Sequence, residues 1–287
     1  MLPVMVLAAG LGTRLRPLTE HCAKPLVPVG DRPALAHVLD RLYAAGATRI
    51  VVNAHHHAAQ VRAFVEGLDA GAGVALSEET DLLGTAGGIA RAAPLLGEGD
   101  VLVWNGDILA DVDVASLVAA HQAPSQATLL VQPLPAGRGP VGVDAQGRVV
   151  RLRQDRFGAE ATGGDFLGIH VLGRGLRERL PASGGLVEDV LVPAMARGEE
   201  VRAVLFDAPW QDIGTVPTYL AANVAWLRER GLDRWVGPGA QVDPGVVLDA
   251  SVVGEGAVVS GSGFVVRSVV WPGARAVAPL TDAVVTS

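Results

Sequence analysis

A six-residue period near the C-terminus constrains the fold of this chain more than any other feature. The apolar positions that repeat, with the count slipping by one after each set, are Val236, Val242 and Leu248, then Val253, Val259 and Val265, then Val270 and Ala276. Glycine or proline fills the turns between them. Small turn residues at this period are typical of a parallel β-helix, in which a three-sided coil uses about eighteen residues. We therefore expect residues 233–287 to form a short β-helix of fewer than three coils.

The rest of the chain has a different pattern, because strand-like runs alternate with helical patterns from residue 4 to about 230. The predicted strands are 4–9, 48–52, 74–76, 101–104, 127–134, 166–172 and 201–206, with a hairpin over 141–152. The predicted helices are 31–46, 58–68, 87–96, 187–196 and 215–230. This alternation predicts an α/β fold, a Rossmann-like mixed and mainly parallel sheet with helices on both faces.

Composition limits the possible classes of protein. At 287 residues, the chain has room for one large domain, 1–232, and a small second one, 233–287. A net charge of −7 argues against a general nucleic-acid surface, which needs a basic face. The single cysteine, Cys22, excludes an intrachain disulfide. We find no signal-peptide pattern and no apolar run long enough to span a membrane, and we expect a cytoplasmic protein.

A glycine-rich turn follows the first predicted strand. Gly10 and Gly12 lack a Cβ, so their amides can approach a ligand closely, and amides in such a turn before a helix bind anions. Arg14 adds a fork of donors suited to phosphate, and Lys24 adds a mobile charge. The dinucleotide fingerprint G-x-G-x-x-G fails at Leu15, so the glycines alone leave phosphate binding undecided.

The longer string L-A-A-G-x-G-T-R-L-x-P-L-T, followed by K-P-L-V-P-V, resembles the opening of the sugar-1-phosphate nucleotidylyltransferases, which make nucleotide sugars. The resemblance implies that residues 1–232 are a catalytic domain. It also implies that Arg14 and Lys24 are catalytic, with the lysine beside the reacting phosphates. The implied nucleotide-binding residues are Leu7, Ala8, Ala9, Gly10, Gly12, Thr13 and Arg14. The C-terminal repeats resemble the left-handed hexapeptide-repeat β-helix that follows the catalytic domain in many of these enzymes.

Two aspartates, Asp107 and Asp212, come after predicted strands, where ligands of open α/β sheets gather. Carboxylate pairs hold Mg²⁺ against phosphate oxygens, although Asp107 is also a common turn residue and Asp212 could cap a helix. N-G-D and W-x-D-I-G-T resemble the metal-binding motifs of the family, which implies that both aspartates are catalytic and bind Mg²⁺. We expect Asp111 and Asp113 to be surface or capping residues.

The segment 77–88 resembles the E-x-x-x-L-G-T-A-G stretch that recognises the base in this family. The resemblance implies nucleotide contacts by Glu79, Gly84 and Thr85. A carboxylate accepts two hydrogen bonds, which suits the adjacent N–H donors of guanine. Relatives that use UTP can also be acidic there, and a solvated acidic loop is the alternative.

The sugar side of the resemblance is less complete. Gly142 resembles the glycine of a Y-G-V-V sugar contact, and Glu188 matches an acidic position that binds sugar hydroxyls. Asp155 stands where many relatives have the lysine of F-x-E-K-P, which binds the sugar phosphate. Either Arg153 or Arg156 supplies this charge, or the chain belongs to a branch that binds the sugar phosphate differently.

The predicted reaction joins an NTP and a sugar 1-phosphate into an NDP-sugar and pyrophosphate. Our first choice of substrates is GTP and mannose 1-phosphate. The alternatives are a uridylyl- or thymidylyltransferase acting on glucose, N-acetylglucosamine or N-acetylmuramate 1-phosphate, and a catalytically silent nucleotide-sugar-binding regulatory subunit. Residues 236–287 contain no histidine, which argues against an acyltransferase. Because a short β-helix needs cover at its ends, we also expect a homo-oligomer through sheet or β-helix contacts.

Overall fold

The computed structural model describes residues 1–69 and 71–287, which group into two compact units. Unit 1 comprises Met1–Leu11 and Leu39–Pro209, and unit 2 comprises Gly12–Val38 and Trp210–Ser287. The predicted boundary at residue 233 does not coincide with any of these limits, and it remains a prediction.

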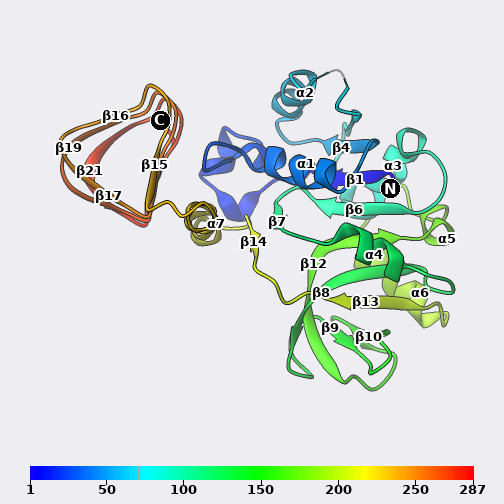
Figure 1. Cartoon of the computed structure of the whole chain (residues 1–287). Helices are drawn as coiled ribbons and strands as arrows, with labels where there is room; N and C mark the ends of the chain where they lie inside the picture. The colour runs from blue at the N-terminus through cyan, green and yellow to red at the C-terminus, as the bar shows by residue number, and fades with distance from the viewer. Residues whose placement is uncertain (70) are drawn as a thin grey trace. The chain divides into compact units, whose positions relative to one another are not determined.

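Unit 1 is built on a ten-stranded mixed sheet (Figure 1). Its parallel part contains β1 (Val4–Leu7), β4 (Ile50–Ala54), β5 (Val74–Glu78) and β6 (Val101–Asn105). The long strand β12 (Thr162–Leu172) runs antiparallel to β6, β8 (Ala127–Leu134) and β9 (Val141–Val143). The sheet is completed by β10 (Val149–Leu152), β11 (Asp155–Arg156) and β13 (Val201–Leu205), which pairs with β8 in parallel.

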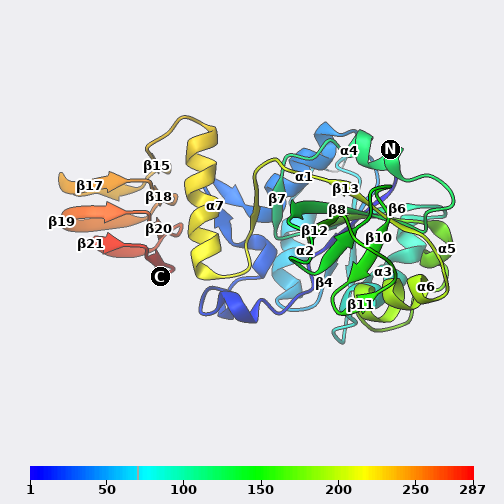
Figure 2. The same ribbon diagram turned by 90° about the horizontal axis from the view of Figure 1, so that it is seen from below.

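Helices cover both faces of this sheet. They are α2 (Ala58–Glu66), α3 (Gly84–Leu96), α4 (Val114–Ala120), α5 (Arg174–Arg177) and α6 (Val192–Ala196), the last preceded by a π-helical turn at Val187–Leu191. The α3 helix packs on β1, β4 and β5, whereas α4 packs on β8 and β12, and Figure 2 shows α4 on the side opposite to α3 and α6. The α/β class and the parallel centre of the sheet are therefore confirmed.

Some element limits differ from the prediction for local reasons. The helix expected from Asp31 is α1 (Ala34–Ala44), because Arg32–Pro33 forms β3 and pairs with β2 (Pro28–Val29). The α3 helix begins three residues before Gly87, through glycines whose low helix propensity hides it from the sequence pattern. The α4 helix was not expected, and Asp113 caps it by accepting a hydrogen bond from the Ser116 amide at 3.0 Å.

One buried side chain on β12 lacks hydrogen-bond partners. His170 is 1% exposed, and neither ring nitrogen has a partner among the described residues. The ring of Phe166 meets it edge-on at 5.5 Å between centroids. Burial lowers the pKa of His170 to about 3, so the ring stays neutral in the folded protein.

This histidine should make folding sensitive to acid. Unfolded, His170 takes a proton near its ordinary pKa of 6.5, whereas the folded protein takes it only near 3. The free energy of unfolding should therefore fall as the pH falls from 6.5 towards 3. We expect the loss between pH 7 and pH 5 to be about 2 kcal/mol smaller in His170→Leu, measured by urea denaturation. Equal losses in the two proteins would show that the histidine is not the acid-sensitive group.

Unit 2 contains the long helix α7 (Val216–Glu229), capped by Thr215. Its N-terminal part carries three short 3₁₀ helices, Thr13–Leu15, Leu18–Glu20 and Lys24–Leu26, and the β2–β3 hairpin. The glycine-rich turn therefore leads into a 3₁₀ helix of only three residues. The prediction that the N-terminus of a regular helix follows this turn and assists anion binding is wrong.

After α7, the chain folds into two small parallel sheets (Figure 1). Their strands are β15 (Arg234–Val236), β16 (Gln241–Val242), β17 (Gly245–Asp249), β18 (Ser251–Val253), β19 (Val258–Val266), β20 (Val269–Val270), β21 (Arg275–Thr281) and β22 (Val284–Val285). The pairs that the period marked as equivalent are direct neighbours: Val236 with Val253, Val253 with Val270, Val242 with Val259, Val259 with Ala276, and Leu248 with Val265. The period thus predicted the register of parallel strands.

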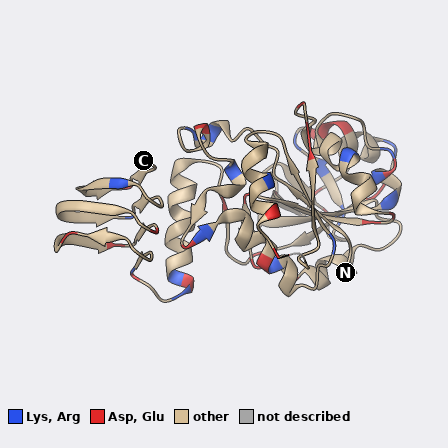
Figure 3. Ribbon diagram, turned by 90° about the horizontal axis from the view of Figure 1, so that it is seen from above, with Lys and Arg blue, Asp and Glu red and all other residues tan. Residues whose placement is uncertain are grey.

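Within the described residues, none of the helices combines the length and the hydropathy needed to cross a bilayer. In the view of Figure 3, acidic and basic residues are interspersed over the ribbon.

Candidate functional site

The end of β1 is held from two sides. The Ala8 amide donates to Asn53 Oδ1 at 2.6 Å, and the Gly106 amide donates to the Leu7 carbonyl at 2.9 Å. A Cβ on Gly106 would lie 3.2 Å from that carbonyl, so the N-G-D turn approaches the glycine-rich turn closely. The structure therefore brings Asp107, which is partly buried, to the carboxyl end of β1.

Asn53 is a residue that the sequence analysis missed. It lies in β4, and its Nδ2 donates to Glu79 Oε1 at 2.6 Å while its Oδ1 accepts from Ala8. The second oxygen of Glu79 accepts from the Leu83 amide at 3.1 Å. One chain of buried and partly buried hydrogen bonds thus joins the end of β1 to the loop before α3. The only sequence signal for it was a single polar residue within the apolar run Ile50–Ala54.

These contacts within the protein are enough to explain why position 79 carries a carboxylate. Glu79 is 5% exposed, and both of its protein partners are N–H donors, which an acceptor-only group satisfies. Gly88 leaves the room for the pair, since a Cβ there would lie 2.7 Å from Asn53 Nδ2 and 2.8 Å from Glu79 Oε1. The alternative of a solvated acidic loop does not describe Glu79, which is buried.

The start of α3 is joined to the segment that carries Glu188. Leu83 accepts a hydrogen bond from the Gly184 amide at 2.8 Å, and Thr85 Oγ1 accepts one from the Leu186 amide at 2.7 Å. Gly84 has φ +75°, and a Cβ there would overlap the Gly184 carbonyl. The predicted base loop and the predicted sugar-binding segment are therefore neighbours within unit 1.

Glu188 forms an ion pair with Arg153 at 2.5 Å, with both side chains about half exposed. Arg153 lies in the two-residue turn between Leu152 and Asp155, which pair across the β10–β11 hairpin. Its φ of +53° is the left-handed conformation that favours glycine, and its amide donates to the Pro140 carbonyl at 2.6 Å. The structure thus places Arg153, one of the two candidate arginines, beside Glu188, which is predicted to bind the sugar.

Gly142 lies against a buried ion pair. Arg151 Nε donates to Glu160 Oε2 at 2.6 Å, and the two side chains are 5% and 9% exposed. A Cβ on Gly142 would overlap the Glu160 carboxylate. The glycine predicted to contact the sugar is therefore also required by the packing of this pair.

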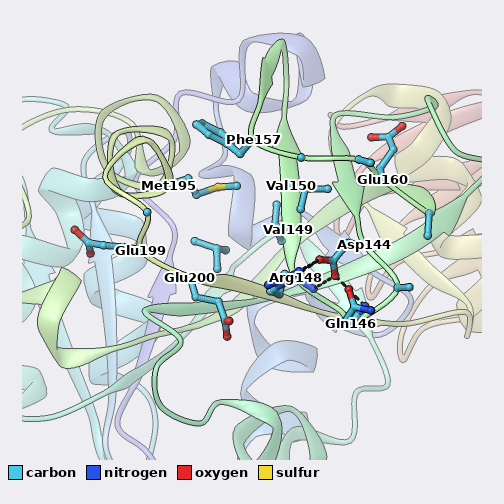
Figure 4. A pocket seen from close by; sticks show the side chains of 16 residues that line it. Asp144, Gln146, Arg148, Val149, Val150, Phe157, Glu160, Met195, Glu199 and Glu200 are labelled. Atoms are coloured by element: carbon cyan, nitrogen blue, oxygen red, sulfur yellow. Dashed lines mark hydrogen bonds and ion pairs between the residues drawn. The ribbon is translucent and has the colours of Figure 1, made fainter.

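A cavity of about 700 Å³ lies beside this pair, between the β9–β10 hairpin and the chain entering β13. Figure 4 shows the Asp144–Arg148 pair on the hairpin and Glu199 on the opposite wall. Hydrogen bonds and charges from Arg179 and then Arg197 lower the pKa of Glu199 to about 2. None of the predicted site residues lines this cavity, so it is separate from the candidate site.

Unit 2 holds the two predicted cations. Gly12 has φ +63°, and a Cβ there would lie 2.8 Å from Thr19 Cγ2 and 3.2 Å from Lys24 Cβ. The Gly12 carbonyl accepts from Thr19 Oγ1 at 2.8 Å, which fixes the turn. Arg14 is exposed on the 3₁₀ helix that follows. The structure thus brings the glycine turn and Lys24 together within this unit.

Asp212 also belongs to unit 2. It ends β14 (Trp210–Asp212) and is partly buried. The cap of α7 is Thr215, whose Oγ1 accepts from the Thr218 amide at 3.3 Å, so the helix-capping alternative for Asp212 is wrong. Gly214 leaves room for the carboxylate, because a Cβ there would lie 2.7 Å from Asp212 Oδ2.

Metal binding was predicted for Asp107 and Asp212. Over residues 1–69 and 71–287, no three His, Cys, Asp or Glu side chains are grouped as a metal site. Carboxylate oxygens are nevertheless the ligands that Mg²⁺ prefers, and Mg²⁺ commonly takes one or two carboxylates with substrate phosphates and water completing its shell. The donor chemistry of the two aspartates fits such a site.

Known proteins resemble most of this chain. At 31% identity over 232 residues, it matches a mannose-1-phosphate guanylyltransferase of Mycobacterium tuberculosis, covering 78% of this chain and 64% of the relative. It is 30% identical over 248 residues to the mannose-1-phosphate guanylyltransferase catalytic subunit beta of Drosophila pseudoobscura pseudoobscura. That match covers 82% of this chain and 66% of the relative. A UTP–glucose-1-phosphate uridylyltransferase of Synechocystis is 28% identical over 258 residues, and the match covers 83% of this chain and 66% of the relative. The chain thus spans somewhat less than two thirds of these curated relatives.

The fold also has solved counterparts. A crystal structure of HddC from Yersinia pseudotuberculosis, complexed with GMP-PN, superposes with a TM-score of 0.67 and covers 79% of this chain and 100% of that one. At 23% sequence identity, this likeness shows the fold. Residues 3–229 match the sequence profile described as nucleotidyl transferase. Since the match covers most of the chain, the protein belongs to the nucleotidyl transferase family.

Proposed function

We propose that this protein is a sugar-1-phosphate nucleotidylyltransferase, which converts an NTP and a sugar 1-phosphate into an NDP-sugar and pyrophosphate. The hydrogen bond from Gly106 to Leu7 is the observation that carries the proposal, because it places Asp107 beside the turn Ala8–Gly10. GTP and mannose 1-phosphate are our first choice, supported by the guanylyltransferases among the relatives. UTP and glucose 1-phosphate are the alternative, supported by the uridylyltransferase.

In the proposed reaction, a phosphate oxygen of the sugar attacks the α-phosphorus in line, and the bond to the leaving pyrophosphate breaks. Lys24 stabilises charge on the α-phosphate, and Arg14 holds the departing pyrophosphate. Asp107 and Asp212 would hold Mg²⁺, which would supply charge neutralisation at the phosphates. The sugar phosphate is already ionised, so no general base is required. Positioning and charge neutralisation provide the catalysis.

In this proposal, backbone groups bind the nucleotide. The residues Leu7, Ala8, Ala9, Gly10, Gly12 and Thr13 surround the triphosphate, and Gly84 and Thr85 approach the base. Glu79 is proposed to shape this pocket through Asn53 and Leu83. Its hydrogen bonds to both residues support that role.

A substitution at Glu79 separates this role from direct base recognition. Glu79→Gln replaces one acceptor with a donor, so a buried N–H loses its partner and the free energy of unfolding should fall by about 2 kcal/mol. The ratio of kcat/KM for GTP to that for UTP should stay the same. Glu78→Gln is the matched control, because Glu78 is partly exposed and pairs with Arg62. A changed base preference at unchanged stability would instead assign Glu79 to the base.

On the sugar side, we propose contacts through Gly142 and Glu188, with Arg153 supplying the charge for the sugar phosphate. The ion pair between Arg153 and Glu188 supports Arg153 over Arg156. A side chain kept in a backbone conformation that favours glycine also supports a role for this arginine.

We further propose residues 1–232 as the catalytic domain and 233–287 as a short left-handed β-helix, in a cytoplasmic homo-oligomer. The register of the C-terminal strands supports the β-helix. A panel of four NTPs against mannose, glucose, N-acetylglucosamine and N-acetylmuramate 1-phosphates, read by pyrophosphate release with Mg²⁺, tests the function. If no pair releases pyrophosphate, the chain is better explained as a silent nucleotide-sugar-binding subunit.

A further inference from the structure

The backbone that follows Lys24 is fixed to α7 within unit 2. The hydroxyl of Tyr219, which is fully buried, donates to the Pro28 carbonyl at 2.7 Å. The Gly30 amide donates to Asn223 Oδ1 at 2.9 Å, and a Cβ on Gly30 would overlap the ring of Trp226. Two backbone groups of this short segment are therefore bound by side chains of one helix.

The same hydroxyl is also bound by the C-terminal strands. Trp271, which follows β20, donates from its indole Nε1 to Tyr219 Oη at 2.9 Å. An indole can only donate and a carbonyl can only accept, so the phenol must accept from Trp271 and donate to Pro28. Burial raises the pKa of Tyr219, so the phenol keeps the proton that it donates.

We propose that Tyr219 and Trp271 are positioning residues, which hold the segment Lys24–Pro28 in place and thereby make the C-terminal strands part of the nucleotidyl-transfer machinery. Loss of the Tyr219 hydroxyl leaves the Pro28 carbonyl and the Trp271 N–H without this partner. Loss of the Trp271 N–H leaves the hydrogen bond from Tyr219 to Pro28, but it removes the hydrogen bond that the Tyr219 hydroxyl accepts. The consequence for catalysis rests on the proposed role of Lys24, whereas the anchoring itself does not.

The chain contains a reporter for this anchoring. Cys22 is the single cysteine in the sequence, and it lies two residues before Lys24. Burial raises the pKa of its thiol to about 11, so the thiol stays protonated and poorly reactive at pH 8 while the segment is in place. Because a thiol reacts as the thiolate and only when accessible, release of the segment should speed its modification.

The experiment measures the rate at which a thiol reagent, 5,5′-dithiobis(2-nitrobenzoate), modifies Cys22 in the full chain at pH 8. We expect Tyr219→Phe to raise the rate by about tenfold and Trp271→Phe by about threefold, as one or two lost hydrogen bonds predict. Trp235→Phe is the matched control, since Trp235 meets Trp226 edge-on at 6.0 Å and lies outside this hydrogen-bond chain. The modification rates should stay the same when a low concentration of urea is added. This insensitivity distinguishes local opening of the segment from global unfolding.

The kinetic readout separates positioning from folding. In Tyr219→Phe, kcat for NDP-sugar formation should fall by about tenfold while KM for the sugar 1-phosphate stays the same, because the loss concerns the lysine segment. If neither variant changes the modification rate, the anchoring is overturned. Faster modification at unchanged kcat overturns the positioning role alone. If the wild type forms no NDP-sugar with any pair, the proposed function fails, and the modification rates still decide the anchoring.

Should Tyr219→Phe fail to fold, Trp271→Phe decides the question, because it keeps the aromatic ring and the buried phenol. A Cys22→Ser protein, unreactive towards the reagent, confirms that the signal comes from this thiol.

Discussion

Replacing Asp107 with alanine is expected to lower kcat for NDP-sugar formation by on the order of 10²-fold or more, as removal of a charge contact in the transition state typically does. Asp107 follows the Gly106–Leu7 contact, so its carboxylate lies where the end of β1 meets the reacting phosphates in our proposal. Steady-state pyrophosphate release with the substrate pair chosen by the panel measures the effect. Lys24→Ala should lose as much, because it removes the charge proposed for the α-phosphate.

Asp111→Ala is the matched control for Asp107. It removes the same side chain four residues later, from an exposed position after β7 (Ile108–Ala110), and kcat should stay near the wild-type value. Near-wild-type turnover in Asp107→Ala would refute the assignment of this residue.

The second large effect concerns stability at Arg151. Its guanidinium binds Glu160 and donates to the Gly139 carbonyl at 2.7 Å and the Val141 carbonyl at 3.2 Å, and the side chain is almost fully buried. Arg151→Met leaves the Glu160 carboxylate without its partner and frees these carbonyls. We expect the free energy of unfolding to fall by about 3 kcal/mol, measured by urea denaturation.

Arg148→Met provides the comparison on the same hairpin. Arg148 is half exposed and pairs with Asp144 at 2.7 Å, and exposed pairs contribute little. The urea midpoint should therefore change far more in Arg151→Met than in Arg148→Met. Equal shifts would show that burial of the Arg151–Glu160 pair does not contribute as described.

Patterns that repeat along the chain predicted structure well. The six-residue period with its slips identified residues such as Val242 and Val259, which are direct neighbours in parallel strands, because equivalent positions pack in the same apolar cluster. The apolar run 101–104 predicted β6 within one residue, since a strand buried on both faces needs no polar positions. The start of α3 was less accurate because its glycines carry no helical pattern.

The sequence motifs predicted the residues of the candidate site, but they did not predict the contacts among its neighbours. Asn53 lies 45 residues from Ala8 and 26 from Glu79, and nothing in the local sequence joins these three. The reason for a glycine at 142 depends on Arg151 and Glu160, whose pairing follows from the β9–β10 register and from the chain after β11. Such contacts depend on tertiary packing, which a single sequence does not specify through spacing.

The most direct test of the central claim is product analysis by ³¹P nuclear magnetic resonance. The full chain is incubated with Mg²⁺, an NTP and the sugar 1-phosphate chosen by the panel, with Asp107→Ala as the control. We predict equal amounts of NDP-sugar and pyrophosphate, formed by the wild type at a rate at least about 10²-fold above the variant. Release of orthophosphate without NDP-sugar, or equal rates in the two proteins, would contradict nucleotidyl transfer at this site.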